Sequence, residues 1–569
     1  MKPTLRKAAF ALVATGIALP LALSGCSPSN NDAGPKNSQS TGGTTAGPAK
    51  EARTLRVWAG SQTPIVANFN PFAPTVLHAA LGPIYEPLFF YNKTGADAPV
   101  GLLGDSFEYN ADGTVITVKL KSGITWNDGK PFTADDVAFT FGYEGNKNDH
   151  FVSAKAVDET TVELTYDAPQ YTNEFGILGA TWMLPKHIWS EVKDFTTFTD
   201  EKPVGTGPYV VDSVTDASYT VVANEKFRTP GVPAIKTVQY IGIDANQSAQ
   251  DLLAAGDLDW AGMFIPNPDA VTANGIISWV NTPQDPTVLY TCANADQGCK
   301  GEQTDVAVRQ ALNLAIDRAS INEKAFVGLT GKISPAFTLM PRDEKWLADP
   351  ANAESPQTAD AAAAGAILEA AGYTKDAEGF YGKDGKAIEL DLVSVDGWTD
   401  YNDAAKLISE QAAAAGIKVN ASTVQWQEFS DARQTGNYEL IMGGVIGTSV
   451  ADPFQIYRDW FSGPYTAKVG TQLAPGHWNF SRYANPVVDK AVTEAAATND
   501  EAAKKAAYAT IQTEIVRDLP YIPLLINATQ TFYNTRDFEG WPTEDNLYAF
   551  PPSWGSVASG YILQQIKQK

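Results

Sequence analysis

Several short segments of the chain alternate apolar and polar residues in the way that half-buried β-strands do. In VITVKLK, residues 115–121, every second residue is Ile, Val or Leu, which predicts an antiparallel strand with one buried face. The apolar run LRVWAG at 55–60 predicts a first strand that ends at a glycine. Further strands are expected in SYTVVAN, 218–224, and TVQYIGI, 237–243.

A helical period follows in TADDVAFTFGY. Thr133 suits the N-cap position, and Asp135 and Asp136 suit the positive end of the helix dipole. Val137 and Phe141 stand four residues apart, on one side of a helix. We therefore expect a helix that starts at this threonine.

In the second half of the chain, helical and strand patterns alternate, which predicts an α/β fold class. The segment 306–326 places Val308, Leu312 and Ile316 on one apolar stripe and predicts a helix. The tail 529–569 is aromatic, rich in proline and poor in helix signals. Further helices are expected in 248–258, 363–372, 404–416, 485–497 and 504–516, and strands in 388–395, 418–424 and 438–446.

The composition is that of a folded protein with a strong negative charge. Hydrophobic residues make up 44% of the 569 residues and charged residues 19%, which is typical of globular chains. The net charge of −23 would repel nucleic acid and anionic lipid headgroups. A nucleic-acid partner is therefore excluded, and we expect a monomer.

The N-terminus has the pattern of an exported lipoprotein. Basic residues precede an apolar run, and Leu-Ser-Gly-Cys follows, which resembles the bacterial lipobox. We expect residues 1–25 to be a signal peptide and Cys26 to carry the lipid. Residues 26–52 have the Ser, Gly and Pro content of a flexible tether. The chain is thus expected on the outer face of the cytoplasmic membrane, held there by its lipid alone.

The two other cysteines, Cys292 and Cys299, form an even pair in an oxidising compartment, so we expect a disulfide. A metal pair is the alternative, but it lacks support because no histidine is close to either cysteine in sequence. No metal or cofactor is expected. The chain's histidines are His78, His150, His187 and His477.

Several motifs resemble, in order and spacing, the bacterial family 5 extracellular solute-binding proteins, which are receptors of ATP-driven importers. Taken singly, each motif has the composition of a turn or a helix start, so together they identify the fold and not the site. The motifs are LGDSF at 103–107, ADGTVITVKLKSGITWNDGKPFTADDVAF at 111–139, GTGPY at 205–209, VRQAL with AIDR at 308–318, and NPVVD at 485–489.

The resemblance implies a two-lobed periplasmic-binding-protein fold of class II, with a small domain inserted in the first lobe. The ligand would lie in the cleft between the lobes, and closure would bury it. The closed protein would then dock on a permease whose cytoplasmic ATPases supply the energy. The expected boundaries are 53–85, 205–285 and 529–569 for the first lobe, 86–204 for the inserted domain and 286–528 for the second lobe.

The sequence favours an oligosaccharide over a peptide as the ligand. In the family's peptide receptors, a carboxylate in Asp-Tyr-x-Asp-Pro pairs with the peptide amino group; here Ser449 takes its place before Asp452 and Pro453. An ammonium buried without a counter-ion would cost several kcal/mol. The tail segment WPTEDN at 541–546 resembles the family's β-linked oligosaccharide receptors, which suggests a gluco- or manno-oligosaccharide.

Flat rings and amides are the groups that would bind a sugar, because rings pack on its C–H faces and amides bond its hydroxyls. Trp541, Trp398 and Trp426 are the expected stacking residues. Packing in the core is the competing role for Trp541, and Trp126, Trp182, Trp189 and Trp346 are assigned to structure. The further candidates are Asn68, Asn294, Phe264 and Asn546.

Other functions find less support. The chain has no nucleophile elbow, zinc-protease motif, P-loop or Rossmann glycine triplet, so we expect no enzyme. A nickel or haem receptor would need clustered histidines or methionines, which the sequence lacks. An oligopeptide receptor is the alternative that stays open.

Overall fold

The structure is a computed structural model. It describes residues 52–60, 64–73, 75–147, 150–243, 246–445, 447–474 and 477–569. The predicted signal peptide, the lipid-bearing Cys26 and the tether up to residue 51 lie outside the described residues.

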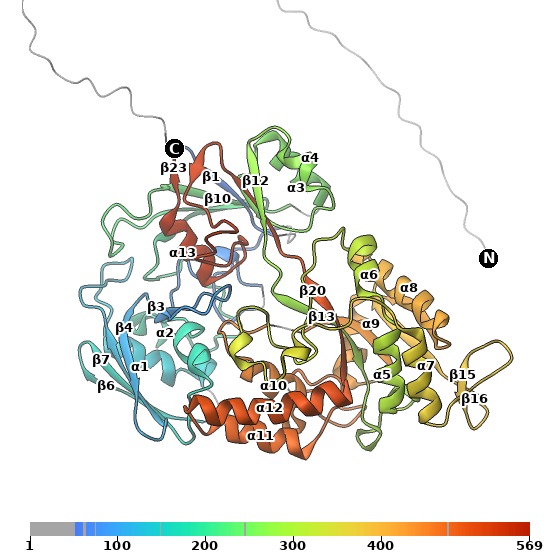
Figure 1. The fold of residues 1–569 in the computed structure, drawn as a ribbon. Helices are drawn as coiled ribbons and strands as arrows, with labels where there is room; N and C mark the ends of the chain where they lie inside the picture. Colours follow the sequence, from blue (N-terminus) through green and yellow to red (C-terminus); the bar gives the residue numbers. More distant parts are fainter. Residues whose placement is uncertain are drawn as a thin grey trace, which may run out of the picture. The chain divides into compact units, whose positions relative to one another are not determined.

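A seven-stranded sheet forms the first lobe, in the order β12-β21-β11-β1-β10-β9-β8 (Figure 1). The strand β1 pairs in parallel with β10 and β11, and the other pairs are antiparallel. The sheet therefore joins three separate stretches of the chain. Its strands are β1 (Leu55–Trp58), β8 (Tyr209–Val214), β9 (Ser218–Ala223), β10 (Thr237–Ile241), β11 (Trp260–Gly262), β12 (Ile277–Asn281) and β21 (Gln530–Asn534).

A five-stranded sheet forms the second lobe, in the order β18-β17-β19-β13-β20. Parallel pairing of β17 with β18 and β19 brings the carboxyl ends of these strands to one edge. The strands are β13 (Asp285–Thr291), β17 (Glu389–Val395), β18 (Lys418–Val424), β19 (Leu440–Gly444) and β20 (Tyr521–Asn527). The helices are α5 (Val306–Ala315), α6 (Arg318–Ala325), α7 (Ala361–Ala370), α8 (Thr399–Ala414), α9 (Trp426–Thr435), α10 (Phe454–Phe461), α11 (Pro486–Ala496) and α12 (Glu501–Asp518).

Two connections join these sheets. The chain passes from β12 to β13 through residues 282–284, and it returns from β20 to β21 through residues 528–529. The connections are bonded to each other, because Thr282 N donates to Thr529 O at 2.9 Å and Thr529 N donates to Asn281 Oδ1 at 3.1 Å. The fold class is therefore the predicted one, α/β with two lobes.

A third sheet, β4-β5-β7-β6, packs against α1 (Ala134–Gly142). Val137 and Phe141 of α1 are buried, and Thr133 forms a capping box with Asp136, so the predicted helix start is confirmed. Trp126 lies in this core, fully buried. The strands are β4 (Gly104–Tyr109), β5 (Val115–Leu120), β6 (Phe151–Asp158) and β7 (Thr161–Tyr166).

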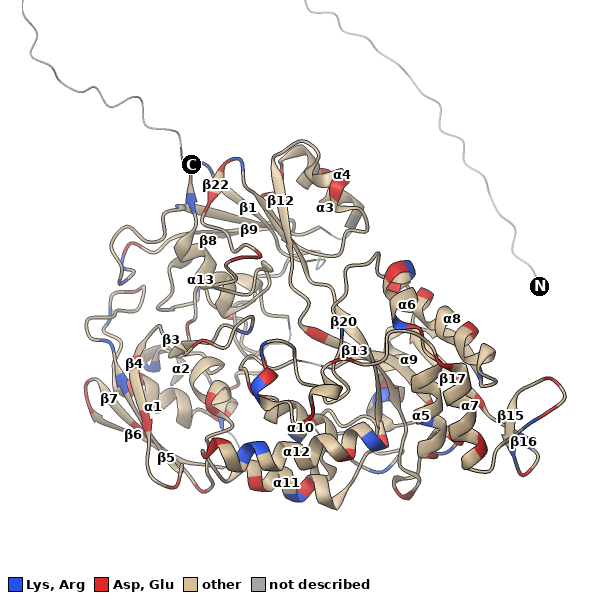
Figure 2. Cartoon of the chain, in the orientation of Figure 1, with Lys and Arg blue, Asp and Glu red and all other residues tan. Residues whose placement is uncertain are grey.

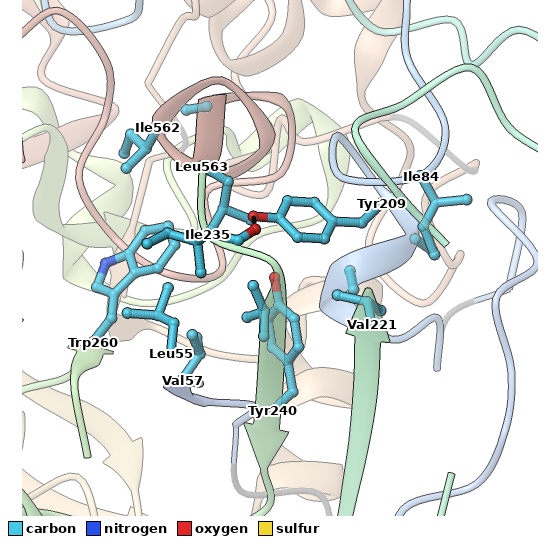
Figure 3. Packing of buried hydrophobic residues seen from close by; sticks show 14 of the residues in the cluster. Leu55, Val57, Ile84, Tyr209, Val221, Ile235, Tyr240, Trp260, Ile562 and Leu563 are labelled. Carbon is cyan, nitrogen blue, oxygen red and sulfur yellow. Dashed lines mark hydrogen bonds between the residues drawn. The ribbon is translucent and has the colours of Figure 1, made fainter. Parts of the chain in front are cut away.

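Two helix predictions need correction. The tail forms a helix, α13 (Val557–Gln565), whose Ile562 and Leu563 pack with Leu55 and Val57 of the first sheet (Figure 3). Because this helix is held by burial against the sheet, its sequence carries little helix signal of its own. The predicted single helix at 306–326 is broken at Asp317, which caps α6 by accepting from Ser320 N.

The remaining elements are short. Small sheets pair β2 (Phe89–Phe90) with β3 (Val100–Gly101), β22 (Phe538–Glu539) with β23 (Lys567–Gln568), and β15 (Tyr381–Lys383) with β14 (Thr374–Lys375) and β16 (Lys386–Ala387). The other helices are α2 (Lys186–Trp189), α3 (Asn246–Ala255) and α4 (Pro268–Thr272). Among the described residues, none of the helices has the length and apolar character that crossing a membrane takes.

Candidate ligand-binding site

A cavity of about 430 Å³ lies between the second lobe and two segments of the chain near the third sheet. The first segment, 91–99, connects β2 to β3, and the second, 171–180, follows β7. We call these two segments together the N-side wall. The second-lobe wall consists of residues 345–346, 449–458 and the start of α12. The volume is that of a small-molecule site.

A smaller hollow of about 150 Å³ adjoins this cavity. The two share Tyr91, Phe175 and Ser449 in their linings. From there the smaller hollow reaches Trp182 and Phe550, beside the start of α13. The cavity thus continues from the second lobe toward the first.

Aromatic rings line the N-side wall. Tyr91, Tyr171 and Phe175 are half-buried, so part of each side chain is open to the cavity. The rings of Tyr91 and Phe175 meet edge to face at 5.5 Å. On the second-lobe wall Trp346 is 5% exposed, and its Nε1 donates to Ala451 O at 2.7 Å. The N-side wall therefore presents flat apolar surface to the cavity, whereas the ring of Trp346 is almost wholly enclosed by the second lobe.

The loop between β19 and α10 carries Ser449 into the cavity, where it lines both hollows. Asp452, three residues later, is engaged with the protein itself. Its carboxylate accepts from Tyr508 Oη at 2.5 Å and from Phe454 N at 2.9 Å, and it lies 3.4 Å from Lys504 Nζ. The Asp-Pro turn therefore fixes the start of α10 and leaves Ser449 to face a ligand.

The cations of the second-lobe wall each have a carboxylate partner. Arg458 Nε is 2.6 Å from Asp459 Oδ1, and Lys345 Nζ is 3.7 Å from Glu501. Lys504 is paired with Asp452, as described. Figure 2 shows the same mixing of both signs along α12, where blue and red segments follow one another. This wall has little charge left for a ligand.

The N-side wall holds a carboxylate of a different kind. Glu174 accepts from Tyr91 Oη at 2.9 Å and from Tyr109 Oη at 3.5 Å. Burial raises the pKa of Glu174 above 4.5, while the two tyrosine hydroxyls oppose that shift. Burial and the nearby carboxylate raise the pKa of both tyrosines, so they remain proton donors. Within the described residues, Glu174 has no ion pair.

Contacts between the lobes border this site. Arg342 Nη1 donates to Lys93 O at 2.9 Å, and Arg342 Nη2 donates to Thr448 Oγ1 at 2.7 Å. Lys93 Nζ lies 3.8 Å from Asp285 and 4.1 Å from the ring centroid of Phe550. The bond from Arg342 to Lys93 O and the approach of Lys93 to Asp285 join the N-side wall to the second lobe beside the cavity.

Trp398 and Trp426 come together as neighbours, at another place in the second lobe. Trp398 lines a separate hollow of about 280 Å³ with Tyr401 and Asn527. The ring of Trp426 is 5.8 Å from that of Trp398, and Trp426 is 49% exposed on α9. Neither tryptophan lines the larger cavity.

Trp541 lies in the core of the first lobe, which is the competing role predicted for it from the sequence. It is 6% exposed, stacks on Tyr533 at 4.7 Å and lies 5.5 Å from Trp260. Its Nε1 donates to Asn534 O at 3.2 Å. Both its ring and its donor therefore have partners within the first lobe.

The other predicted residues also lie outside the cavity and the hollow beside it. Asn68 bonds within its own loop, to Thr75 Oγ1 at 3.1 Å. Asn294 accepts from Asp296 N at 2.9 Å and caps a short turn. Phe264 is half-buried after β11, and Asn546 is exposed in a turn. Of these residues, Asn294 bonds the backbone of its own turn, as amides in turns commonly do.

The sequence interpretation missed the cavity's own residues. Tyr171, Glu174 and Phe175 stand in QYTNEFG, which has neither strand nor helix periodicity. The signal that could have found them is the mixture of rings and amides in a connecting segment. Trp182 and Trp346, assigned to structure, line the hollow and the cavity respectively.

The cysteine pair has the geometry that a disulfide requires. The sulfur atoms of Cys292 and Cys299 lie within bonding distance, and their Cα atoms are 5.4 Å apart. Over the described part of the chain, no three His, Cys, Asp or Glu side chains are grouped as metal ligands.

Comparison with known proteins identifies the family of this chain. The model of the bacterial extracellular solute-binding proteins, family 5, matches residues 98–468. The chain belongs to this family. Its resemblance to the family, inferred from the motifs, is thus confirmed. The protein is therefore a solute-binding receptor of an ABC importer, and it acts outside the cytoplasm.

Similar proteins differ in what their names say they bind. The oligopeptide-binding protein AppA of Bacillus subtilis is 26% identical, over 91% of this chain and 93% of its own length. The periplasmic oligopeptide-binding protein of Thermotoga maritima has a crystal structure that is 26% identical, with a TM-score of 0.82, covering 91% of this chain and 99% of its own. A mannohexaose-bound structure of that protein aligns with a TM-score of 0.76 at the same identity and coverage.

Proposed function

We propose that this receptor captures an oligosaccharide, of the β-linked gluco- or manno- type, in the cavity between the N-side wall and the second lobe. The observation that carries the proposal is the half-buried ring surface of Tyr91, Tyr171 and Phe175 beside the neutral Ser449. Pyranose rings pack on such surfaces through their C–H faces. The mannohexaose-bound relative of similar fold supports the same ligand class.

Amides at the cavity supply the polar half of sugar recognition. Asn92, Asn173, Gln455 and Asn499 line it, and the last two are exposed there. Hydroxyls of a sugar need several such donors and acceptors at once. Trp398, at the separate hollow of the second lobe, and Trp426 beside it would be the stacking residues of an alternative sugar site, which this proposal does not use.

In this proposal the sugar contacts both walls and shifts the population toward the closed lobes. The closed form docks on a permease, whose ATPases drive uptake. Cys26 anchors the protein through its lipid, and Cys292 and Cys299 form a disulfide. Replacing Cys26 with Ala should release the protein into the medium, and retention at the membrane would contradict the anchor.

Oligopeptide binding is the second candidate, because Glu174 is a carboxylate without an ion pair at the cavity and AppA is named for oligopeptides. Isothermal titration separates the two. We expect binding of cello- or manno-oligosaccharides and none of a mixed peptide pool. Binding of peptides alone would overturn the proposal.

A further inference from the structure

We propose that Glu174 recognises a primary ammonium group of the ligand. The inference rests on the proposed function in taking this cavity as the ligand site. The inference goes beyond the proposed function because it assigns the ligand a positive charge at a defined position. Neither an uncharged sugar nor an acylated amine would satisfy this position fully.

The first step is where the carboxylate lies. Glu174 lines the cavity, and so does Tyr91, which donates to it. Tyr109 donates from β4, on the side of the third sheet. Tyr91 Oη donates to Oε1 at 2.9 Å and holds the carboxylate, while Tyr109 Oη lies 3.5 Å from Oε2 and 3.4 Å from Gln170 O. Each oxygen retains a lone pair that a ligand donor can use.

The second step is the shortage of positive charge around Glu174. Of the basic residues lining the cavity, Lys504 is near enough to favour the charged form of Glu174. That lysine is itself 3.4 Å from Asp452. Arg458 and Lys345 are paired with Asp459 and Glu501. The described residues thus leave Glu174 as a carboxylate without a dedicated cation.

The third step is what such a group binds best. A partly buried carboxylate is costly when only neutral hydroxyls compensate its charge. A ligand ammonium supplies the missing charge and a charge-assisted hydrogen bond, which is stronger than a bond to a sugar hydroxyl. A neutral hydroxyl needs only an amide, and the cavity has several. Glu174 is therefore explained better by a cationic ligand group.

Two kinds of ligand contain a primary ammonium group that could bind Glu174. One is an amino sugar within an oligosaccharide, and the other is the α-amino end of a peptide. Both have an acetylated counterpart of nearly the same shape without the charge. A titration with matched pairs therefore tests the ammonium itself and also reports its source.

The experiment is isothermal titration of the protein with four ligands. They are a β-linked glucosamine oligomer, the N-acetylglucosamine oligomer of equal length, a short peptide and its N-acetylated form. We expect the free amine to bind at least about tenfold more tightly than its acetylated partner in at least one pair. Equal binding within each pair, or binding of the acetylated ligands alone, would overturn the inference.

Two variants test whether Glu174 causes the preference for the free amine. Glu174→Gln keeps the size of the side chain and an acceptor for a tyrosine hydroxyl, and it should reduce the preference for the amine to about twofold or less. Glu191→Gln makes the same charge change at an exposed residue just after α2, outside the cavity and the hollow beside it, and it should keep the preference. A preference that survives in Glu174→Gln would overturn the assignment. The wild-type comparison stands even if a variant fails to fold.

Failure of this inference and failure of the proposed function give different results. If the peptide pair binds with a preference for the free amine and neither sugar binds, the oligosaccharide proposal fails and the role of Glu174 stands. If both sugars bind equally well and the free peptide is not preferred over its acetylated form, the oligosaccharide proposal stands and the role of Glu174 fails.

Discussion

The two walls of the cavity differ in how their charges are used. On the second-lobe wall, Arg458, Lys345 and Lys504 each have a carboxylate within ion-pair distance. On the N-side wall, Glu174 is bonded only to tyrosine hydroxyls. The second-lobe wall is therefore stabilised by its own charges. The N-side wall keeps a charge available for the ligand.

The largest effect is expected from breaking an ion pair of the second-lobe wall. Asp452→Ala removes the partner of Lys504, which is 8% exposed, and the acceptor of Tyr508. The loss should lower the free energy of unfolding by about 3 kcal/mol, since the buried charge of Lys504 is left without its partner. Urea denaturation measures this change. A loss below about 1 kcal/mol would show that this wall does not depend on its pairs.

The next largest effect is expected on the pH dependence of ligand affinity, through Glu174 of the N-side wall. Because burial raises the pKa of Glu174 above 4.5, its carboxylate is protonated at a higher pH than an exposed glutamate. A ligand amine loses its own charge above about pH 8. Affinity for an amine ligand should therefore be highest near neutral pH and fall as the pH is lowered and Glu174 takes up a proton.

The other titratable groups that face Glu174 do not change the direction of this pH dependence. Tyr91 and Tyr109 keep their protons at neutral pH, because burial and the nearby carboxylate raise the pKa of both hydroxyls. The acetylated ligand serves as the control, and its affinity should change little over the same range. The same fall for both ligands, in titrations at a series of pH values, would remove Glu174 as the cause.

A smaller effect, on sugar affinity, is expected when an aromatic ring of the N-side wall is removed. Phe175→Ala removes a half-buried ring from the N-side wall and should weaken sugar binding about fivefold, or about 1 kcal/mol. Trp426→Ala removes an exposed ring that does not line the cavity and should leave the affinity unchanged. Titration of both variants with one sugar makes the comparison. The opposite result would place the site at the hollow beside Trp398.

The smallest effect is expected at an exposed pair of the second-lobe wall. Lys345 and Glu501 are both about half exposed, and Lys345 Nζ also lies 4.5 Å from the ring of Trp346. Lys345→Met should change stability by about 0.5 kcal/mol or less, because exposed pairs contribute little. Its effect on sugar affinity should be less than about twofold. A tenfold loss of affinity would assign Lys345 to the ligand.

The sequence predicted the parts of this fold that have local signals. The alternation in 115–121 and the cap at Thr133 appear in the structure as β5 and the start of α1. The helix α13 was missed, because contact with the first sheet and not its own sequence holds it. Sequence patterns therefore predict a helix or strand when its own residues favour that structure.

The site was harder to predict because it is made by tertiary contacts. Tryptophan is as useful in a core as against a sugar, and packing on Tyr533 and Trp260 decides the case for Trp541. Tyr171 and Glu174 stand in a connecting segment without periodicity, and only the fold brings them opposite the second lobe. Ser449 was singled out through a family motif, and it does line the cavity.

The central claim is that the cavity between the N-side wall and the second lobe holds an oligosaccharide. The most direct test is a crystal structure of the protein grown with a manno- or cello-oligosaccharide. We predict sugar rings against Tyr171 and Phe175, with Ser449 facing the ligand from the opposite wall. A sugar found only beside Trp398, or a peptide in the cavity, would contradict the account.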